Sequence, residues 1–371
     1  MGTTQSDASR VMHSIIQRIA TGPDLSKDIS REEAYLGTRA IIENQIDPVQ
    51  AGIYFIALRM KRETQDENRG VLDAVVATTR RVTAQVDEVV DIGDPYDGYN
   101  RCLPAAPFLG PVLAECGVAA VAHGLDRVGP KYGVTARHVL AAAGLDVDLD
   151  PEAAARRLAD PDIGWAYLDQ AQYNPRLHEL GGLRARMIKR QALTTVEVLS
   201  KPIVGRKKTH FVTGYVHKPY PPIYADLARQ AGFDSAFIVR GVEGGVIPSL
   251  RQAGKAHYYR DPHAEGEIEL AIDPAALGIR QDVRAVPFPA GLPVREAEDE
   301  VAIAVDVPAT AKAAAEAGLA ALNGRQGPTY DSLVLGASLI LHHVGRAPGL
   351  TEAARQVRAA LDSGRAMRRV K

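Results

Sequence analysis

The chain has 371 residues, of which 46% are hydrophobic and 24% charged, and its 44 Lys and Arg residues against 45 Asp and Glu residues leave a formal net charge of −1. This length is typical of one large or two linked domains, which need no disulfide or metal to stabilise their core. The near-neutral charge excludes a globally basic nucleic-acid-binding protein but allows a local basic patch. Two cysteines, Cys102 and Cys116, exclude a disulfide framework.

Targeting and membrane segments are not evident in the sequence. Residues 1–10 are polar and lack the apolar stretch of roughly 7–15 residues that a secretory signal requires. The most apolar stretches, residues 112–121 and 332–341, are far shorter than the roughly 20 residues of a spanning helix. We therefore expect a cytoplasmic protein with no membrane partner.

The amino-terminal part reads as helical. Apolar residues recur at helical spacing between residues 9 and 82, which predicts three or four helices. Two helix starts carry capping signals: Ser30 and Glu33 have the spacing of a capping box, and Asp47 precedes Pro48 at a first helical position.

From residue 88 the pattern changes to short β-type runs that alternate with helical ones. Strands are expected at residues 88–92, 118–122, 165–168, 211–216, 236–240 and 267–272, and helices between them, as at 108–115 and 223–231. Three further helices are expected at residues 309–322, 330–344 and 350–361. This alternation predicts an α/β fold with a mostly parallel central sheet beside a small all-helical domain. The cleft between the two parts is the expected ligand site.

Ordered motifs at both ends of the chain are similar to those of a known family. They are residues 327–337 (GPTYDSLVLGA), 345–347, 350–353 and 361–366 near the carboxyl end, and residues 25–34, 47–51 and 57–64 near the amino end. These stretches resemble the closing and opening segments of anthranilate phosphoribosyltransferases. The resemblance covers nearly the whole chain and is weakest in the middle.

The resemblance implies the two-domain fold that this family shares with pyrimidine nucleoside phosphorylases. We expect a helical domain of residues 1–86, completed by part of residues 180–205, and an α/β domain of residues 87–371 that includes the carboxyl-terminal helices. The resemblance also implies a phosphorylated ribose donor, an aromatic acceptor, magnesium, and a homodimer formed through the opening helices.

The donor-binding loop departs from the family pattern. The family's Gly-Thr-Gly-Gly-Asp-Gly run corresponds to residues 93–98 (GDPYDG), and its Asn-Ile-Ser-Thr stretch to residues 104–107 (PAAP). Proline removes an N–H donor, and the phosphate-binding hydroxyl groups are gone. Either the donor is not phosphoribosyl pyrophosphate, or the loop binds it differently, or the loop is simply a tight turn. Asp97 and Gly98 are the candidate donor-binding residues here.

A second family motif, Lys-His-Gly-Asn-Arg followed by Ser-Lys-Ser-Gly, matches residues 122–127 and 130–133. In the family these segments line the acceptor and the donor phosphates. The candidates carried over are His123, Gly124, Arg127, Lys131 and Gly133. By the resemblance His123 acts on the acceptor as a catalytic residue, while the other four bind the donor, and Arg127 stands one position later than the family's arginine.

Two arginines six positions apart, Arg184 and Arg190, match a pair that the family shows before a long apolar helix. By that match Arg184 faces the acceptor carboxylate as a catalytic residue, and Arg190 is a second acceptor ligand. A guanidinium group suits this role because it donates two parallel hydrogen bonds. The alternative is that residues 184–190 and 206–208 form a basic face, either solvated or bound to nucleic acid.

The family's magnesium-binding Asp-Glu pair is halved in this chain. Glu243 stands in place of the Asp, but Gly244 replaces the second carboxylate. One or two carboxylates together with substrate phosphates are a common Mg²⁺ site, so Glu243 is a candidate metal ligand. Residues 243–245 could equally form a glycine-lined anion pocket after a strand.

Tyrosine recurs near the expected cleft, at Tyr96, Tyr99, Tyr132, Tyr215 and Tyr220. These rings either stack on an aromatic ligand or pack at half-buried edges, and the sequence leaves both open.

We therefore predict a divergent pentosyltransferase, which transfers a 5-phosphoribosyl group to a nitrogen of an aromatic or heterocyclic acceptor by positioning and electrostatic stabilisation. The alternative is a relative without this chemistry that binds nucleic acid or another polyanion through its basic stretches. A nucleoside phosphorylase is disfavoured because it needs a phosphate site resembling the same lost glycine loop.

Overall fold

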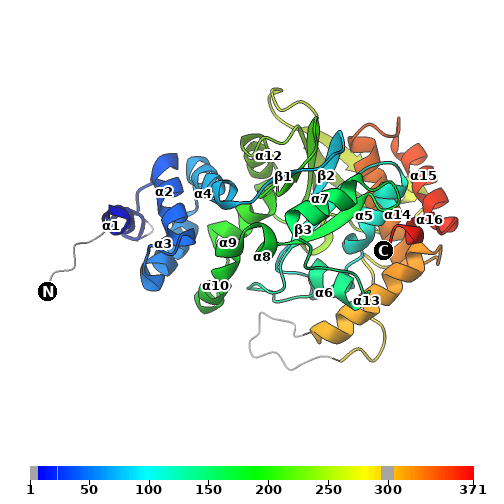
Figure 1. The fold of residues 1–371 in the computed structure, drawn as a ribbon, viewed down its shortest axis with the longest axis horizontal. Helices are drawn as coiled ribbons and strands as arrows, with labels where there is room; N and C mark the ends of the chain where they lie inside the picture. Colours follow the sequence, from blue (N-terminus) through cyan, green and yellow to red (C-terminus); the bar gives the residue numbers. More distant parts are fainter. Residues whose placement is uncertain (1–6, 23, 294–304) are drawn as a thin grey trace.

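The computed structural model describes residues 7–22, 24–293 and 305–371. A group of helices lies at one end of the molecule, and a sheet with helices on both faces lies at the other (Figure 1). The chain thus has the predicted α/β fold with a small helical part. The predicted domain ranges include residues 1–6 and 294–304, which lie outside the described residues.

The amino-terminal helices begin where the capping signals predict. They are α1 (Asp7–Ile19), α2 (Arg31–Ile42), α3 (Pro48–Lys61) and α4 (Gln65–Thr78). At the start of α2, the Ser30 hydroxyl accepts from the Glu33 N–H, and the Glu33 carboxylate accepts from the Ser30 N–H. Asp47 caps α3 with Pro48 in its first turn. Both predicted helix starts are confirmed. The side-chain acceptors satisfy backbone N–H groups that have no partner within the helix.

A later group of short helices packs against the first four. It comprises α8 (Gln170–Tyr173), α9 (Pro175–Glu179), α10 (Gly181–Met187) and α11 (Ala192–Val196). Helices α10 and α11 contact α3, and α9 and α11 contact α4. Tyr54 and Phe55 of α3 share one buried apolar cluster with Leu193 and Val196 of α11. This packing supports our proposal that part of residues 180–205 completes the helical domain.

The α/β part is built on a seven-stranded sheet with the order β4-β3-β2-β6-β7-β8-β9. Its strands are β2 (Glu88–Gly93), β3 (Ala120–Gly124), β4 (Trp165–Asp169), β6 (Lys208–Tyr215), β7 (Ser235–Arg240), β8 (Gly254–Tyr259) and β9 (Ile268–Ile272). The first five strands in this order pair in parallel, and β8 and β9 pair antiparallel. A separate parallel pair is formed by β1 (Val82–Thr83) and β5 (Ile203–Val204). The prediction of a mostly parallel sheet is confirmed.

One strand of the central sheet was not predicted. Strand β8 has the sequence GKAHYY, and only its Ala256 and Tyr259 are buried. This sequence shows neither the continuous apolar run of a central parallel strand nor the regular alternation of a half-buried one. Strand β8 is identified by its antiparallel pairing with β7, in which Val239 lies opposite Ala256.

The remaining helices cover the sheet. They are α5 (Leu109–Glu115), α6 (Ala136–Ala142), α7 (Pro151–Ala159), α12 (Tyr220–Gln230), α13 (Val307–Leu322), α14 (Pro328–His343), α15 (Leu350–Asp362) and α16 (Arg365–Arg368), with short 3₁₀ turns η1 (Ala106–Phe108), η2 (Glu197–Leu199), η3 (Val242–Gly244) and η4 (Ala275–Leu277). The three predicted carboxyl-terminal helices correspond to α13, α14 and α15. Within the described ranges, no helix has the length and apolar character needed to cross a bilayer.

The strand order creates a crevice. From β2 the strand order continues through β3 and β4 toward one edge of the sheet. The chain later returns to lie beside β2 and continues through β6 and β7 toward the other edge. The carboxyl ends of β2 and β6 therefore flank the point where the winding reverses, and α/β proteins bind ligands at such points.

Candidate functional site

A pocket of about 250 Å³ opens at the carboxyl ends of β2 and β6. Gly93 of β2 and Thr213 of β6 form its floor, where the Thr213 hydroxyl donates to the Gly93 carbonyl at 2.7 Å. Its other walls come from α3, α11, α12 and η3. We call this site the cleft pocket. Its principal side chains are Arg59, Tyr96, Asp97, Arg190, Thr194, Tyr215, His217, Tyr220, Tyr224 and Glu243.

The helical wall of the cleft pocket combines aromatic rings with arginine. The Arg59 guanidinium group donates to the Tyr220 hydroxyl at 3.0 Å and to Glu63 at 3.4 Å. The rings of Tyr220 and Tyr224, one turn apart on α12, have centroids 5.8 Å apart. Burial is the main cause that raises the pKa of Glu63, whereas Arg59 opposes the shift. Flat ring faces beside guanidinium groups suit a planar aromatic anion.

Arg59 and Tyr224 of this wall were not predicted as ligand residues from the sequence. Arg59 belongs to residues 57–64, which indicated the family but were not assigned a ligand role. Tyr224 follows Tyr220 by four positions, so both face the same side of α12. This helical spacing was the available signal for Tyr224.

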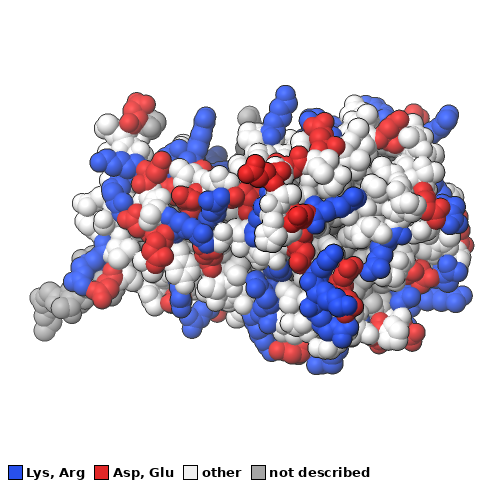
Figure 2. Space-filling view, turned by 90° about the horizontal axis from the view of Figure 1, so that it is seen from above, with Lys and Arg blue, Asp and Glu red and all other residues white. Residues whose placement is uncertain are grey.

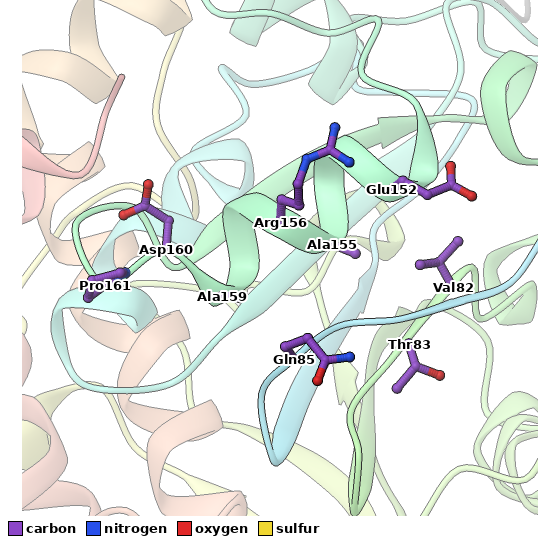
Figure 3. A pocket seen from close by; sticks show the side chains of 9 residues that line it. All are labelled: Val82, Thr83, Gln85, Glu152, Ala155, Arg156, Ala159, Asp160 and Pro161. Atoms are coloured by element: carbon purple, nitrogen blue, oxygen red, sulfur yellow. The ribbon is translucent and has the colours of Figure 1, made fainter.

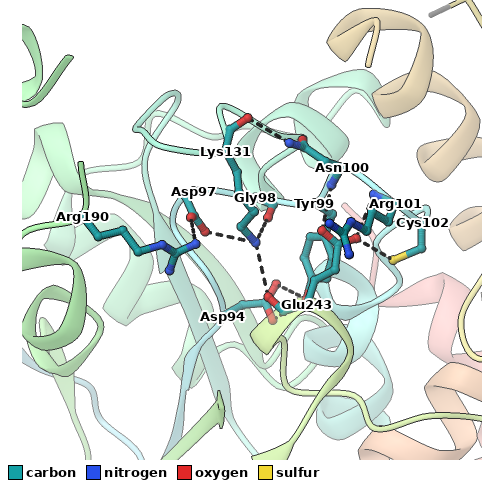
Figure 4. A network of polar contacts seen from close by, with 10 residues as sticks. All are labelled: Asp94, Asp97, Gly98, Tyr99, Asn100, Arg101, Cys102, Lys131, Arg190 and Glu243. Carbon is teal, nitrogen blue, oxygen red and sulfur yellow. Dashed lines mark hydrogen bonds and ion pairs between the residues drawn. The ribbon is translucent and has the colours of Figure 1, made fainter. Parts of the chain in front are cut away.

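The loop after β2 is held by a carboxylate of the chain itself (Figure 4). Oε2 of Glu243 accepts from the Asn100 N–H at 3.0 Å, and Oε1 accepts from the Arg101 N–H at 2.9 Å. The thiol of Cys102 also contacts Oε1 of Glu243, at 3.4 Å, and both burial and the Glu243 charge raise the pKa of that thiol. Glu243 therefore braces the loop through both oxygens.

A second carboxylate neutralises the cations at this loop. Asp97 pairs with Nζ of Lys131 at 3.2 Å and with Nη2 of Arg190 at 2.5 Å. The Lys131 ammonium group also donates to the carbonyls of Gly98 at 2.5 Å and Glu243 at 3.3 Å. Figure 4 shows these side chains converging from both sides. The structure thus brings together Asp97, Lys131, Arg190 and Glu243, which the sequence analysis had taken from four separate motifs.

Two of the predicted glycines allow this loop to approach the segment around Lys131. Gly98 has φ +74°, a conformation that favours glycine, and a Cβ on Gly133 would lie 2.6 Å from the Tyr99 nitrogen. Tyr99 and Val134 form an isolated bridge between the two segments. Both glycines therefore support the shape of the loop.

Asp94 lies beneath the loop and is buried. The Tyr99 hydroxyl lies 2.8 and 3.0 Å from its two oxygens, and the Val246 N–H donates at 3.1 Å. Burial raises the pKa of Asp94 to about 6, although these hydrogen bonds oppose the shift.

His123 lies behind the wall of the cleft pocket. Its Nε2 is 2.7 Å from Oδ1 of Asp91, and its Nδ1 is 2.5 Å from the Tyr96 hydroxyl, which also contacts the Tyr173 hydroxyl at 2.7 Å. The His123 side chain is fully buried, whereas Tyr96 lines the pocket. His123 itself is not a lining residue of the pocket, and its hydrogen-bond partner Tyr96 is. Burial raises the pKa of Tyr96, and the neighbouring Tyr173 adds to the shift.

Arg184 is placed differently from the prediction. Its guanidinium group forms a bidentate ion pair with Glu197, at 2.7 and 2.6 Å, and the two side chains are 2% and 0% exposed. Arg184 does not line the cleft pocket. The geometry does not support a contact with the acceptor carboxylate, because Glu197 already fills the fork of the guanidinium group.

Of the predicted donor residues only Asp97 lines the cleft pocket; Gly98, Lys131 and Gly133 belong to the loop network beside it, and Gly124 and Arg127 lie outside both. Arg127 is exposed, with its guanidinium carbon 4.9 Å from the centroid of the Tyr132 ring. Gly124 is the last residue of β3, where its neighbour is the Tyr167 side chain. Neither contacts the loop network of Figure 4.

Comparison with known proteins gives the family. Residues 13–79 match the helical bundle domain of a glycosyl transferase family, and residues 105–367 match the a/b domain of the same family. The chain belongs to this glycosyl transferase family. Its curated relatives include an anthranilate phosphoribosyltransferase of Rhodopseudomonas palustris, 28% identical over 96% of this chain and 95% of that protein. An uncharacterised protein of Aquifex aeolicus is 28% identical over 64% of this chain and 71% of its own length.

The chain has the same fold as solved structures of anthranilate phosphoribosyltransferases. Anthranilate phosphoribosyltransferase from Saccharomyces cerevisiae in complex with PRPP and Mg has a TM-score of 0.71 at 16% identity and covers 99% of this chain and 97% of its own. The enzyme from Thermus thermophilus has a TM-score of 0.67 at 19% identity and covers 96% of this chain and 95% of its own. These likenesses confirm the predicted resemblance and fold class.

The magnesium expected of a glycosyl transferase family member does not fit Glu243. Both carboxylate oxygens of Glu243 accept backbone N–H groups, so each already spends one acceptor position within the chain. The nearby Asp94 carboxylate also accepts donors on both oxygens. Among the described residues no group of three or more His, Cys, Asp or Glu side chains could hold a metal ion. The anion-pocket interpretation of residues 243–245 is not supported either, because the N–H groups of Gly244 and Gly245 donate to the carbonyls of Gly241 and Val242.

Four of the seven Lys and Arg side chains in the two basic stretches form ion pairs with acids. Arg206 and Lys207 pair with Asp87 at 2.6 and 2.8 Å, and Arg184 and Arg190 pair with Glu197 and Asp97. Figure 2 shows basic and acidic side chains interspersed over most of one face. Such pairing disfavours a continuous phosphate-binding surface.

A second, more open pocket of about 520 Å³ lies between β1 and α7 (Figure 3). Val82, Thr83 and Ala155 line it together with Glu152 and Arg156. None of the residues predicted from the sequence lies on it. The cleft pocket, which holds several of them, is therefore the candidate functional site.

Proposed function

We propose that this protein binds a planar aromatic or heterocyclic anion in the cleft pocket and transfers a pentosyl group to a nitrogen of that acceptor. The observation that carries the proposal is the pocket at the switch point of the sheet, lined by Arg59, Arg190 and the rings of Tyr215, Tyr220 and Tyr224. The relatives named as anthranilate phosphoribosyltransferases support it, and one solved relative is described in complex with 4-fluoroanthranilate.

In this proposal the chain acts mainly by positioning. Arg59 attracts the anionic group of the acceptor, and the tyrosine rings hold its plane against the pocket wall. Asp91 and His123 fix the Tyr96 hydroxyl and so act as positioning residues. In the transfer, the acceptor nitrogen bonds to C1 of the pentose as the C1–O bond to the donor's phosphate leaving group breaks, and the nitrogen loses its proton to water. The Asp97 and Glu243 carboxylates beside the pocket stabilise the positive charge that develops on C1. No covalent nucleophile is required of the residues that line the pocket.

The proposal is tested first by acceptor binding. Anthranilate is fluorescent, so its binding to the wild-type protein can be titrated directly. Arg59→Gln should weaken binding about 10- to 100-fold, because a charge-assisted hydrogen bond contributes about 1.5–3 kcal/mol. Arg39→Gln, on the exposed surface of α2, is the matched control. An Arg59→Gln protein that binds anthranilate as the wild type does would contradict the assignment.

Transfer is tested separately from binding. Loss of anthranilate fluorescence is followed with phosphoribosyl pyrophosphate and, in parallel, with ribose 1,5-bisphosphate, which carries a monophosphate leaving group. If the wild-type protein turns over anthranilate with either donor, and Arg59→Gln reduces that turnover, pentosyl transfer is supported. Binding of anthranilate without turnover by any pentose donor would leave the protein as a binding protein and refute the enzymatic part of the proposal.

We also propose a homodimer formed through the amino-terminal helices. Large apolar side chains are exposed on α1, α2 and α3: Val11 (36%), Leu36 (42%), Val49 (68%), Ile53 (41%) and Met60 (75%). Several exposed apolar side chains on neighbouring helices are typical of an association surface.

Nucleic-acid binding is the alternative function. Its affinity would fall steeply as the salt concentration rises.

A further inference from the structure

The loop after β2 has the features of an anion site, and the chain itself occupies that site. Asn100 and Arg101 point two consecutive backbone N–H groups at one place, and the Glu243 carboxylate fills it. We propose that Glu243 is a built-in occupant of this two-amide anion site and that it excludes a diphosphate group from the loop. This inference deepens the proposed function and rests on it, because it concerns which donor the site accepts.

Successive N–H groups that converge form a concave anion site in many proteins. Here they follow a parallel strand beside the switch point of the sheet, where ligands of α/β proteins bind. Each oxygen of Glu243 takes one N–H, at 3.0 and 2.9 Å, which is the pattern that two oxygens of one phosphate group would make. The carboxylate thus has the charge and the geometry of the ligand that it replaces.

Glu243 reaches the loop from a backbone conformation that few side chains adopt. Its φ is +54° and its ψ is +17°, in the left-handed region. Non-glycine residues persist there only where surrounding contacts hold them. The two charge-assisted hydrogen bonds to Asn100 and Arg101, together with the Lys131 contact to the Glu243 carbonyl, are such contacts.

The cations that would otherwise attract a phosphate are also paired within the chain. Asp97 is 3% exposed and pairs with both Lys131 and Arg190. An arriving diphosphate would therefore meet two carboxylates, Asp97 and Glu243, before it could reach a free donor. Repulsion of this kind selects between ligands as effectively as attraction does.

The test measures binding of inorganic pyrophosphate by calorimetry to four full-length proteins: the wild type, Glu243→Ala, Glu243→Gln and Glu265→Gln. Glu265 lies in the exposed turn between β8 and β9, so its substitution removes one negative charge without touching the loop. Glu243→Ala empties the site, and Glu243→Gln removes the charge while keeping one oxygen acceptor. Thermal unfolding of each sample shows that it is folded.

We expect Glu243→Ala and Glu243→Gln to bind pyrophosphate at least about tenfold more tightly than the wild type, a factor equivalent to about 1.4 kcal/mol. Glu265→Gln should bind as the wild type does. If Glu243→Ala does not fold, the Glu243→Gln protein decides the test. A Glu243 that only braces the loop would lower the unfolding temperature of its variants without any gain in pyrophosphate affinity, and that result would overturn the proposal. Tight pyrophosphate binding by the wild type, equal to that of the variants, would overturn it as well.

Anthranilate titration of the same samples separates this proposal from the proposed function. Gain of pyrophosphate binding in the variants, with no anthranilate binding by any of the proteins, would uphold the role of Glu243 and refute the acceptor assignment. The opposite pattern would refute the role of Glu243 alone.

Discussion

Replacement of Arg184 tests whether this side chain binds a ligand or holds the fold. Its guanidinium group and the Glu197 carboxylate form two hydrogen bonds, at 2.7 and 2.6 Å, in a fully buried environment. Arg184→Ala leaves the Glu197 charge buried without its partner. Breaking a buried ion pair in this way costs about 3–5 kcal/mol of unfolding free energy.

The expected shift of the unfolding temperature follows from the size of the chain. With an unfolding entropy of about 2.1 cal/mol/K per residue, 371 residues give about 0.8 kcal/mol/K, so a loss of 3–5 kcal/mol lowers Tm by about 4–6 °C. Differential scanning calorimetry measures this shift. Arg186→Ala, an exposed arginine of the same helix α10, should change the unfolding free energy by no more than about 0.5 kcal/mol.

A double variant sharpens the test. Arg184→Met combined with Glu197→Gln removes both charges, and Gln170, which already donates to Glu197, can still donate to the new amide oxygen. The double variant should therefore be more stable than Arg184→Ala. An Arg184→Ala protein that unfolds at the same temperature as Arg186→Ala but no longer binds anthranilate would refute the structural role and restore the ligand role predicted from the sequence.

Three other measurements follow from the structure. Burial raises the pKa of Asp94 to about 6 from 3.8, so its contribution to stability is present below pH 4 and lost as pH rises through 6. Urea titrations at pH 4 and 7 should show the wild type losing about 2 kcal/mol of unfolding free energy relative to Asp94→Asn, and parallel pH profiles would contradict this. Burial is the main cause that lowers the pKa of Lys201 to about 8, so the folded state binds this proton less tightly than the unfolded state does. The unfolding free energy should therefore rise between pH 8 and 10 in the wild type but not in Lys201→Met. Ile53→Asp should convert the proposed homodimer to a monomer in light scattering, and an unchanged mass would place the interface elsewhere.

Much of the fold followed from local patterns in the sequence. The capping box at Ser30 and the alternating strand and helix runs after residue 88 are decided by neighbours within a few residues, so they could be predicted. Strand β8 could not, because its pairing with β7 depends on tertiary contacts that its own sequence does not encode.

The sequence predicted several residues of the candidate site but not the contacts between them. The motifs indicated Asp97, Lys131, Arg190 and Glu243, but not that they would pair with each other. Arg184 matched the family's spacing, yet its partner Glu197 lies thirteen positions along the chain on a different helical turn. Which charges neutralise each other depends on the folded arrangement, and one sequence does not specify it.

The order of strands also determines when the cleft pocket can form during synthesis. Strands β2 and β6 are neighbours in the sheet, but Glu88 pairs with Lys208, so more than a hundred residues separate the partners along the chain. Contacts between such distant segments form slowly, because a long loop must close first. Until β6 arrives, β2 pairs with β3 alone and presents an open edge to other chains. A nascent or truncated chain that ends before residue 208 therefore lacks the ligand site and leaves one edge of β2 unpaired.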